Sequence, residues 1–255
     1  MPTLSLEPEA DVTHAKPFDP TQIPTDKPIA IVTGGGSGIG LAIVHDLARD
    51  HTVIATGRDS AKLARLAEVA NVIPVQLDLM APQDILAFAA AFTHLDVLVN
   101  CAALSDWKSL EQARQSDWEV TFQTNVFAPA ELTRALLPAL RASKGQVVFI
   151  SSGAGVRPVK NHIVYTASKH ALRGLTDTLR LEEVANGVRI ATVAPGPTDT
   201  DQNRANRAAT AADGIGAAAE GELSDPASVA KGVRVVIDTP RDSQITDLVI
   251  RPLLL

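Results

Sequence analysis

Short apolar runs alternate with longer stretches of helical spacing along the chain from Ile29 onward. The runs have the length of buried strands, and the stretches between them place apolar residues at helical intervals. This alternation is typical of βαβ units and predicts an α/β fold built on a parallel sheet. Seven strands are expected, at Ile29–Thr33, Thr52–Thr56, Val72–Leu77, Leu95–Val99, Gln146–Ser151, Val188–Val193 and Thr246–Ile250. Six helices are expected between them, near 39–49, 60–69, 82–92, 117–142, 163–185 and 226–237.

Residues 1–27 lack this alternation. Prolines at positions 2, 8, 17, 20 and 24 interrupt both helical and strand periods. We expect this segment to be a proline-rich, partly disordered arm that is dispensable for the fold. It would be either a leader to the domain or a strap across a neighbour.

Composition limits what the chain can be. Its 255 residues are 45% apolar and 20% charged, and 29 acidic against 23 basic side chains give a net charge of −6. This length accommodates one large α/β domain or two small ones. The acidic balance argues against a nucleic-acid or anionic-membrane partner, and no stretch reaches the ~20 apolar residues of a membrane span.

Two further features favour a cytoplasmic location. The single cysteine, Cys101, excludes an intramolecular disulfide or a cysteine-based zinc site, as expected in a reducing compartment. The N-terminal segment lacks the basic and apolar regions of a signal peptide and the arginines of a transit peptide.

A glycine-rich loop, TGGGSGIG, occupies residues 33–40 between the first expected strand and the first expected helix. Glycines let the backbone turn tightly and approach a pyrophosphate, whose charge the free N–H groups at the helix start favour. The strict G-x-G-x-x-G spacing is absent, and no Gly-Lys-Ser/Thr of a P-loop follows. Taken alone, the loop indicates either a dinucleotide site or a tight βα turn.

Tyr165 and Lys169, in the sequence YTASK, are four residues apart and therefore share one face of an expected helix. An unperturbed tyrosine has a pKa of about 10 and is a poor base near neutrality. An ammonium within ~4–6 Å favours the phenolate, so Lys169 is expected to lower the pKa of Tyr165 toward the range useful for acid–base chemistry. For an isolated pair, a packed tyrosine beside a solvated lysine is the better interpretation.

Ser152 follows an apolar strand and stands thirteen residues before Tyr165. A parallel-sheet enzyme builds its site beyond the carboxyl ends of the strands, where this serine is expected to emerge. A serine at such a place is more often a turn former or a helix cap. Its coincidence with the other two motifs favours a catalytic role.

Together these motifs resemble the short-chain dehydrogenase/reductase family, from Pro28 to Ile250. The matching pieces are TGxxxGIG at 33–40, Asp78-Leu79, Asn100 in VNCAA, Asn125, Ser152, YTASK at 165–169 and PGPTDT at 195–200. The resemblance implies a single-domain, Rossmann-type, doubly wound parallel sheet of seven strands. Residues 28–255 would be the dinucleotide-binding catalytic domain, and the chain would form a homodimer or homotetramer. Cys101-Ala102-Ala103 departs from the Asn-Ala-Gly that the family favours.

The resemblance also implies a role for each residue. Tyr165 would exchange a proton with the reacting oxygen, and Ser152 would hydrogen-bond that oxygen. Lys169 would bind the nicotinamide ribose and hold down the pKa of Tyr165, while Asn125 would position a water that connects Lys169 to solvent. The residues implied to bind the cofactor are Gly34, Gly36, Ser37, Gly38, Ile39, Gly40, Arg58, Asp78, Leu79, Asn100, Ala102, Tyr165, Lys169, Pro195, Gly196, Thr198 and Thr200. No metal site is expected.

The end of the second expected strand, VIATGR, predicts the cofactor. A relative that prefers NAD typically carries an acid there, which hydrogen-bonds the ribose 2′-hydroxyl and repels a 2′-phosphate. Here that position is Gly57, and the guanidinium of Arg58, which follows, can bind a phosphate bidentately. Ser37 adds a hydroxyl but not the second basic residue of some NADP-dependent relatives, and Asp59 partly offsets the charge of Arg58. We expect NADP(H) to be favoured over NAD(H).

The sequence therefore predicts an oxidoreductase that transfers a hydride between NADP(H) and an alcohol or carbonyl group of a small molecule. The alternatives are a catalytically silent dinucleotide-binding sensor or scaffold, and an NAD-preferring dehydrogenase. The complete set of Asn125, Ser152, Tyr165 and Lys169 argues against a silent protein. A nucleotide-sugar epimerase or dehydratase is disfavoured because its usual TGxxGxxG spacing is absent.

The substrate pocket is expected beside the segments that follow Asn100, Ser152 and Pro195. A flexible lid over residues 198–222 would cover it, because this stretch is rich in alanine and interrupted by glycines. His162, one helical turn before Tyr165, either contacts substrate or packs. The sequence does not predict which alcohol or carbonyl compound is bound.

Overall fold

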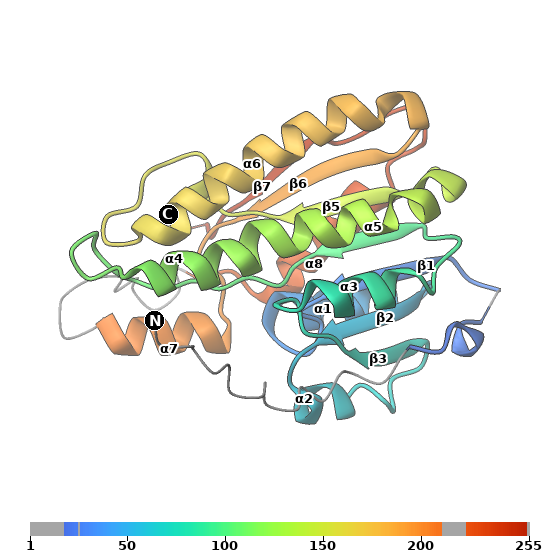
Figure 1. The fold of residues 1–255 in the computed structure, drawn as a ribbon, viewed down its shortest axis with the longest axis horizontal. Helices are drawn as coiled ribbons and strands as arrows, with labels where there is room; N and C mark the ends of the chain where they lie inside the picture. The colour runs from blue at the N-terminus through green and yellow to red at the C-terminus, as the bar shows by residue number, and fades with distance from the viewer. Residues whose placement is uncertain (1–17, 25, 211–222, 254–255) are drawn as a thin grey trace, which may run out of the picture.

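The structure is a computed structural model that describes residues 18–24, 26–210 and 223–253. Its strands form one parallel sheet of seven strands in the order β3-β2-β1-β4-β5-β6-β7 (Figure 1). The predicted doubly wound α/β fold is therefore confirmed. The strands are β1 (Ile29–Thr33), β2 (Thr52–Gly57), β3 (Val72–Gln76), β4 (Val97–Asn100), β5 (Gln146–Ile150), β6 (Arg189–Pro195) and β7 (Asp247–Ile250).

The strand order reverses between β1 and β4. From β1 the strands β2 and β3 follow one another toward one edge of the sheet. From β4 the strands β5, β6 and β7 follow one another toward the other edge. Val32 of β1 lies opposite Val99 of β4, so these two strands end side by side. In open α/β sheets, ligands bind at the carboxyl ends of the strands on either side of such a switch point. The fold thus places the expected site next to the ends of β1 and β4.

Helices cover both faces of the sheet (Figure 1). Helices α1 and α8 pack together on one face, where Val44 and Val233 contact strand residues such as Val32. Helices α3, α5 and α6 cover the other face, where Leu132 and Phe149 belong to a second apolar layer. The α-helices are α1 (Gly38–Leu47), α2 (Ser60–Ala64), α3 (Pro82–Ala89), α4 (Gln115–Phe122), α5 (Ala128–Ser143), α6 (Ile163–Glu183), α7 (Asp201–Thr210) and α8 (Pro226–Ile237).

The helical stretch expected near 117–142 is present, but it is not one regular α-helix. The structure has α4, then a π-helical segment at Gln123–Phe127, then α5. The N–H of Ala128 donates to the carbonyl of Gln123, five residues back. Pro129 has no N–H to donate to the carbonyl four residues before it, which is a physical reason for the helical ladder to change at this point. Apolar spacing alone could not show this change, because the helix axis continues through it.

The helix expected near 60–69 is shorter in the structure. It ends at Ala64, and the chain continues in turns in which the N–H of Leu66 bonds the carbonyl of Leu63 and that of Val69 bonds the carbonyl of Leu66. The apolar spacing of this stretch is satisfied by these turns as well as by a helix, since Leu63 and Leu66 are both buried.

The segment expected to form the lid is helical in its first half. Residues 201–210 form α7. Residues 211–222 lie outside the described part of the chain. The flexibility of the lid therefore stays a prediction.

The last residues of the N-terminal arm pack against the domain. The ring of Phe18 stacks on Phe92 at a centroid distance of 5.5 Å and contacts Phe88 at 5.7 Å. Ile23 packs against the same apolar layer. Residues 1–17 lie outside the described residues, so the division of the chain at residue 27 stays a prediction.

A chain that begins at Lys27 should fold but melt at a lower temperature than one that begins at Phe18. The aromatic contacts of Phe18 should contribute about 1–2 kcal/mol, because such pairs add about 0.5–1.5 kcal/mol to the burial of their surface. For a domain of this size, this corresponds to a decrease of roughly 2–8 °C in the melting temperature. Equal melting temperatures in calorimetry would contradict a stabilising role for residues 18–26.

Candidate active site

The glycine-rich loop, residues 33–40, lies at the end of β1 and has no room for side chains at its closest contacts. We call this loop the cradle. Gly34 and Gly38 have φ angles of 67° and 53°, a region that favours glycine. A Cβ on Gly40 would lie 2.2 Å from the carbonyl oxygen of Gly34. Ser37 precedes α1, and within the described structure its side chain does not cap the helix. The first N–H groups of α1 are therefore available to an anion such as a pyrophosphate.

Loops from two other strands pack on this cradle. A Cβ on Gly34 would lie 3.0 Å from Cα of Ala102, in the loop after β4. A Cβ on Gly38 would lie 3.0 Å from Cγ2 of Thr200, in the loop after β6. Thr33, at the end of β1, accepts a hydrogen bond at Oγ1 from the N–H of Ala102 at 3.0 Å. The structure thus brings together three segments that the sequence associated with the cofactor.

Gly57 and Arg58 lie at the carboxyl end of β2, beyond the cradle. Arg58 is exposed, and its carbonyl oxygen accepts a hydrogen bond from Nε2 of Gln76 at 3.2 Å. Asp59 caps α2, with its Oδ1 accepting from the N–H of Lys62 at 3.1 Å. The carboxylate that was expected to offset Arg58 is therefore engaged by the start of a helix.

Lys62 is a second basic residue at this end of the site. A Cβ on Gly36 would lie 3.2 Å from Cβ of Lys62, so the stem of this lysine packs beside the glycine-rich loop. This second basic residue lies in α2, four residues after Arg58, and not within the glycine-rich loop.

The residues after β3 and at the end of β4 line the region between these loops. Asp78 accepts a hydrogen bond at Oδ1 from the N–H of Met80 at 2.9 Å, and Leu79 packs against the second apolar layer. Asn100 is buried, and its Nδ2 donates to Oγ1 of Thr133 at 3.0 Å. Its Oδ1 is also buried but has no hydrogen-bond partner among the described residues. Such an acceptor is the kind of group that a polar ligand satisfies.

The segment after β6 is fixed by its own hydrogen bonds. Pro195 ends the strand, and the N–H of Gly196 donates to the carbonyl of Ile250 at 2.7 Å. Thr198 is buried and donates from Oγ1 to the carbonyl of Gly196 at 3.0 Å. Thr200 accepts at Oγ1 from the N–H of Asn203 at the start of α7. This segment therefore leads from the sheet directly into the first helix of the expected lid.

Ser152, Tyr165 and Lys169 come together from the turn after β5 and the first turns of α6. Ser152 caps this turn, with its Oγ accepting from the N–H of Ala154 at 3.2 Å, and it also hydrogen-bonds Tyr165. The Nζ atom of Lys169 lies 5.6 Å from the centroid of the Tyr165 ring. It donates to the carbonyl of Ile150 at 3.0 Å. The three predicted catalytic side chains are therefore neighbours.

Burial dominates the electrostatics of this group. It raises the pKa of the Tyr165 phenol, while the hydrogen bond with Ser152 acts in the opposite direction. Burial also lowers the pKa of Lys169 from 10.5 to about 8. The pKa of Tyr165 is thus raised in this structure and not lowered as expected, because desolvation is the largest influence on it. At neutral pH the phenol carries its proton, although a higher pKa makes it a weaker acid.

Asn125 lies in the π-helical segment and ties the loop after β4 to α6. Its Oδ1 accepts from the N–H of Leu104, and its Nδ2 donates to the carbonyl of Leu104, both at 2.8 Å. Nδ2 also donates to Oγ of Ser168 at 3.0 Å, next to Lys169 on α6. Since residue 129 is proline, the main-chain carbonyl of Asn125 lacks its usual α-helical donor. π-Helical turns inside α-helices are frequent at functional sites.

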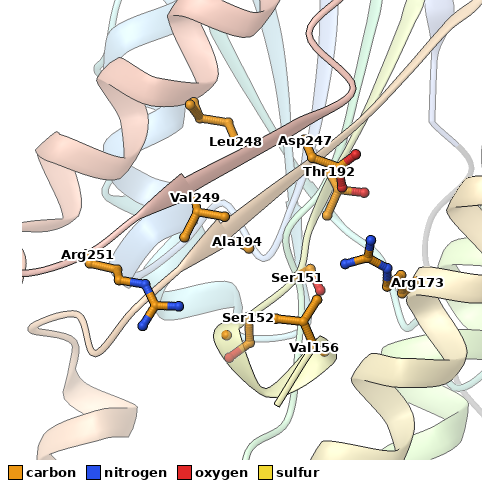
Figure 2. Close-up of a pocket in the computed structure, with 12 residues that line it drawn as sticks. Ser151, Ser152, Val156, Arg173, Thr192, Ala194, Asp247, Leu248, Val249 and Arg251 are labelled. Atoms are coloured by element: carbon orange, nitrogen blue, oxygen red, sulfur yellow. The ribbon is translucent and has the colours of Figure 1, made fainter.

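A pocket of about 230 Å³ opens behind Ser152, between α6 and the ends of β6 and β7 (Figure 2). Arg173 of α6 and Arg251 after β7 lie on opposite sides of it (Figure 2). Ser152 lines this pocket and also hydrogen-bonds Tyr165. The substrate pocket was expected beside the segments that follow Asn100, Ser152 and Pro195. Neither Tyr165 nor Lys169 lines the present pocket, so the place of the substrate stays a prediction.

Two kinds of site are absent from the described part of the chain. It contains no cluster of three or more His, Cys, Asp or Glu side chains that could hold a metal ion. None of its helices has the length and apolar character needed to cross a bilayer.

The family model for short chain dehydrogenases matches residues 28–219 of this sequence. The chain belongs to the short-chain dehydrogenase/reductase family. Membership confirms the family predicted from the glycine-rich loop and the YTASK motif, and it supports the predicted oxidoreductase class. The fold of this family member, with the ends of β1 and β4 side by side, is the one that NAD(P)-binding dehydrogenases share.

Known proteins resemble this chain over most of its length. The uncharacterized oxidoreductase YusZ of Bacillus subtilis is 34% identical over 186 residues, which are 69% of this chain and 66% of YusZ. Glycine betaine reductase ATRR of Emericella nidulans is 29% identical over 240 residues, 90% of this chain but 19% of that protein. The chain thus spans less than two thirds of the length of these two relatives. A structure of the closed form of serine dehydrogenase complexed with NADP+ is 28% identical, with a TM-score of 0.81, and covers 89% of this chain and 96% of its own.

Proposed function

We propose that the protein transfers a hydride between NADP(H) and an alcohol or carbonyl group of a small molecule, with Tyr165 as the general acid and base. The observation that carries this proposal is the grouping of Tyr165, Ser152 and Lys169 at the carboxyl edge of a sheet whose glycine cradle suits a dinucleotide. When bound there, the reduced dinucleotide supplies the hydride.

The residues present fit such a cofactor. The cradle around Gly34 and Gly40 admits no Cβ, and the first N–H groups of α1 adjoin it, as close contact with a pyrophosphate requires. Asn100 contributes a buried acceptor with no partner among the described residues. Arg58 and Lys62 lie at the far end, where the adenine ribose would be held.

In the direction of reduction, Ser152 holds the carbonyl oxygen of the substrate by a hydrogen bond. Tyr165 donates its phenolic proton to that oxygen as the negative charge develops. At neutral pH the phenol, whose pKa burial raises, carries the proton that this step needs. In the direction of oxidation, the phenolate takes the proton of the alcohol.

Lys169 and Asn125 support the proton transfer. Lys169 has three N–H donors, of which one is used by the carbonyl of Ile150, so donors remain for a ribose hydroxyl. The carbonyl of Asn125 lacks its α-helical donor and can hold the water that connects Lys169 to solvent. Lys169 would thus hold the ribose beside Tyr165. Asn125 would hold the water through which the proton that Tyr165 gives up is replaced.

The preference for NADP(H) is supported by charge at the end of β2. Gly57 supplies no acid to repel a 2′-phosphate, and the carboxylate of Asp59 is engaged at the start of α2. Arg58 can bind a phosphate bidentately, and Lys62 adds a second cation one helical turn later. The structural relative serine dehydrogenase was solved with NADP+.

The wild-type enzyme should oxidise NADPH more efficiently than NADH when offered a panel of ketones, sugars and keto acids. Arg58→Ala should lower kcat/KM for NADPH by about ten- to hundredfold, because hydrogen bonds to charged groups contribute about 1.5–3 kcal/mol. Its kcat/KM for NADH should be unchanged. Gly57→Asp should reverse the preference, and it is sterically allowed because a Cβ there makes only ordinary contacts at 3.7 Å with Leu63.

Arg65→Ala is the matched control, because this exposed arginine follows α2 without adjoining the glycine-rich loop. It should leave both cofactors unaffected. Turnover with no member of the panel by either cofactor would argue for a silent binding protein. A wild-type preference for NADH would contradict only the NADP(H) assignment and would leave the proposed oxidoreductase activity in place.

We also propose that the protein is a cytoplasmic homodimer or homotetramer. The single cysteine, Cys101, fits a reducing compartment. Val249 on the outer strand β7 and Val235 on α8 are more than half exposed, as expected for side chains that a second copy covers. Sedimentation equilibrium that returned the mass of one chain would contradict this assembly.

A further inference from the structure

Three aromatic rings from two segments of the chain form a stack that ends on Tyr165. The ring of His162 lies parallel to that of Trp107, with centroids 4.3 Å apart and an interplanar angle of 9°. Its other face stacks on Tyr165 at 4.5 Å and 18°. Trp107 belongs to the loop after β4, whereas His162 immediately precedes α6. The ring of His162 is therefore held between a tryptophan and the proposed catalytic phenol.

The edge of the histidine ring is fixed as well as its faces. Nε2 of His162 is 3.0 Å from Oγ of Ser105, within hydrogen-bond distance. The carbonyl of Ser105 accepts a hydrogen bond from Nδ2 of Asn206 in α7 at 2.7 Å. The backbone of His162 forms an isolated parallel bridge with Lys108. The loop after β4 thus contacts both the ring and the backbone of His162, a residue that is 6% exposed, and α7 contacts that same loop.

The histidine is uncharged at neutral pH. Burial lowers its pKa to about 4, although Asp106, which faces it, acts in the opposite direction. A neutral ring adds no positive charge beside the phenol, and its single N–H is a far weaker acid than an imidazolium. What it does supply is a flat apolar surface over one face of Tyr165. The charged or ionisable groups that face Tyr165 itself are Lys169 and Cys101.

We propose that His162 is a positioning residue for Tyr165: clamped by Trp107 and Ser105, it fixes the plane of the phenol and keeps water from one of its faces. This inference rests on the proposed function, because it assigns the stack a part in proton transfer. His162 also links α7 to Tyr165, because Asn206 of α7 bonds the loop after β4, and this same loop contacts His162. A misplacement of about 1 Å can cost about 10²-fold in rate, so a device that fixes one ring is of catalytic importance.

Tyr165 is the only tyrosine in the chain, so its ionisation can be followed directly by tyrosinate absorbance, without substrate. His162→Ala should move the midpoint of this titration down toward the ordinary tyrosine value, because water then reaches the phenolate. The same variant should lower kcat for carbonyl reduction by about ten- to hundredfold, with the NADPH dissociation constant unchanged. His162→Phe, which restores a flat ring, should recover most of both properties.

His170→Ala is the matched control, because His170 is an exposed histidine on α6 that bonds only the carbonyl of Thr166. It should behave as wild type in both measurements. Ser105→Ala removes only the hydroxyl at the edge of the ring, and it should give a smaller shift and a smaller loss in the same directions. If His162→Ala does not fold, the result with Ser105→Ala tests the inference in its place.

A wild-type titration midpoint and a wild-type kcat in folded His162→Ala or Ser105→Ala would overturn the inference. So would a His162→Phe protein as impaired as His162→Ala, since the hydrogen bond and not the stack would then be responsible. Absence of turnover in the wild type would remove the proposed function, but it would leave the titration result standing as a separate fact about Tyr165.

Discussion

Replacing Tyr165 with phenylalanine should abolish carbonyl reduction in a protein that still folds and still binds NADPH. Phenylalanine keeps the ring that stacks on His162 and removes only the hydroxyl. Loss of a positioned acid costs on the order of 10²–10⁴ in rate. No other phenol can replace it, because the chain contains one tyrosine. The measurement is kcat with NADPH and the best carbonyl compound of the panel, alongside NADPH binding by fluorescence titration.

Two adjacent serines provide the control for this assignment. Both serines line the same pocket, but it is Ser152 that hydrogen-bonds Tyr165. Ser152→Ala should therefore lower kcat strongly, by about 10²-fold as for other donors to a reacting oxygen, and Ser151→Ala should not. A Tyr165→Phe protein with near-normal kcat and a normal melting temperature would exclude Tyr165 as the proton donor.

Most of the sheet could be predicted from the sequence because its inner strands are buried on both faces. Each gives a short, nearly continuous apolar run, as VVFI of β5 does, and glycine or polar residues bound most of these runs. The cradle could be predicted for a similar reason, since only glycine tolerates the backbone of Gly34 and the close approach at Gly40. In both cases the constraint is local and is visible in residue type.

Features that depend on distant contacts could not be predicted in this way. The π-helical segment around Asn125 keeps the apolar spacing of a helix, and its side-chain bonds reach Leu104 in another loop. Phe18 lies in a proline-rich segment whose composition suggests disorder, yet it packs on Phe92. Its partners become known only when the chain is folded.

The candidate site shows the same division between residue type and environment. The motif identified Tyr165 and Lys169, but the direction in which the pKa of Tyr165 shifts depends on how deeply the phenol is buried. Likewise, His162 was recognised only as a residue near the tyrosine. Its importance follows from Trp107 on its far side, 55 positions earlier in the chain and invisible to local spacing.

Lys169→Met should weaken both turnover and cofactor binding. Methionine keeps the length and the apolar stem of the buried lysine but removes the ammonium that donates to the carbonyl of Ile150. If that ammonium also bonds the cofactor ribose, the NADPH dissociation constant should rise by about ten- to hundredfold, as for the loss of a charged hydrogen bond of about 1.5–3 kcal/mol. Lys231→Met, at an exposed position of α8, is the control and should bind as wild type.

The pH dependence of binding tests the same charge without a mutation. Burial lowers the pKa of Lys169 to about 8, so in the folded protein the ammonium is present below this pH and is lost as the pH rises through it. The dissociation constant of NADPH should therefore increase between about pH 7 and about pH 9 in the wild type. A guanidinium does not deprotonate in proteins, so a 2′-phosphate contact made by an arginine should not contribute to the change. In Lys169→Met the profile should be flat, and a wild-type profile that is equally flat would show that the charge of Lys169 does not hold the cofactor.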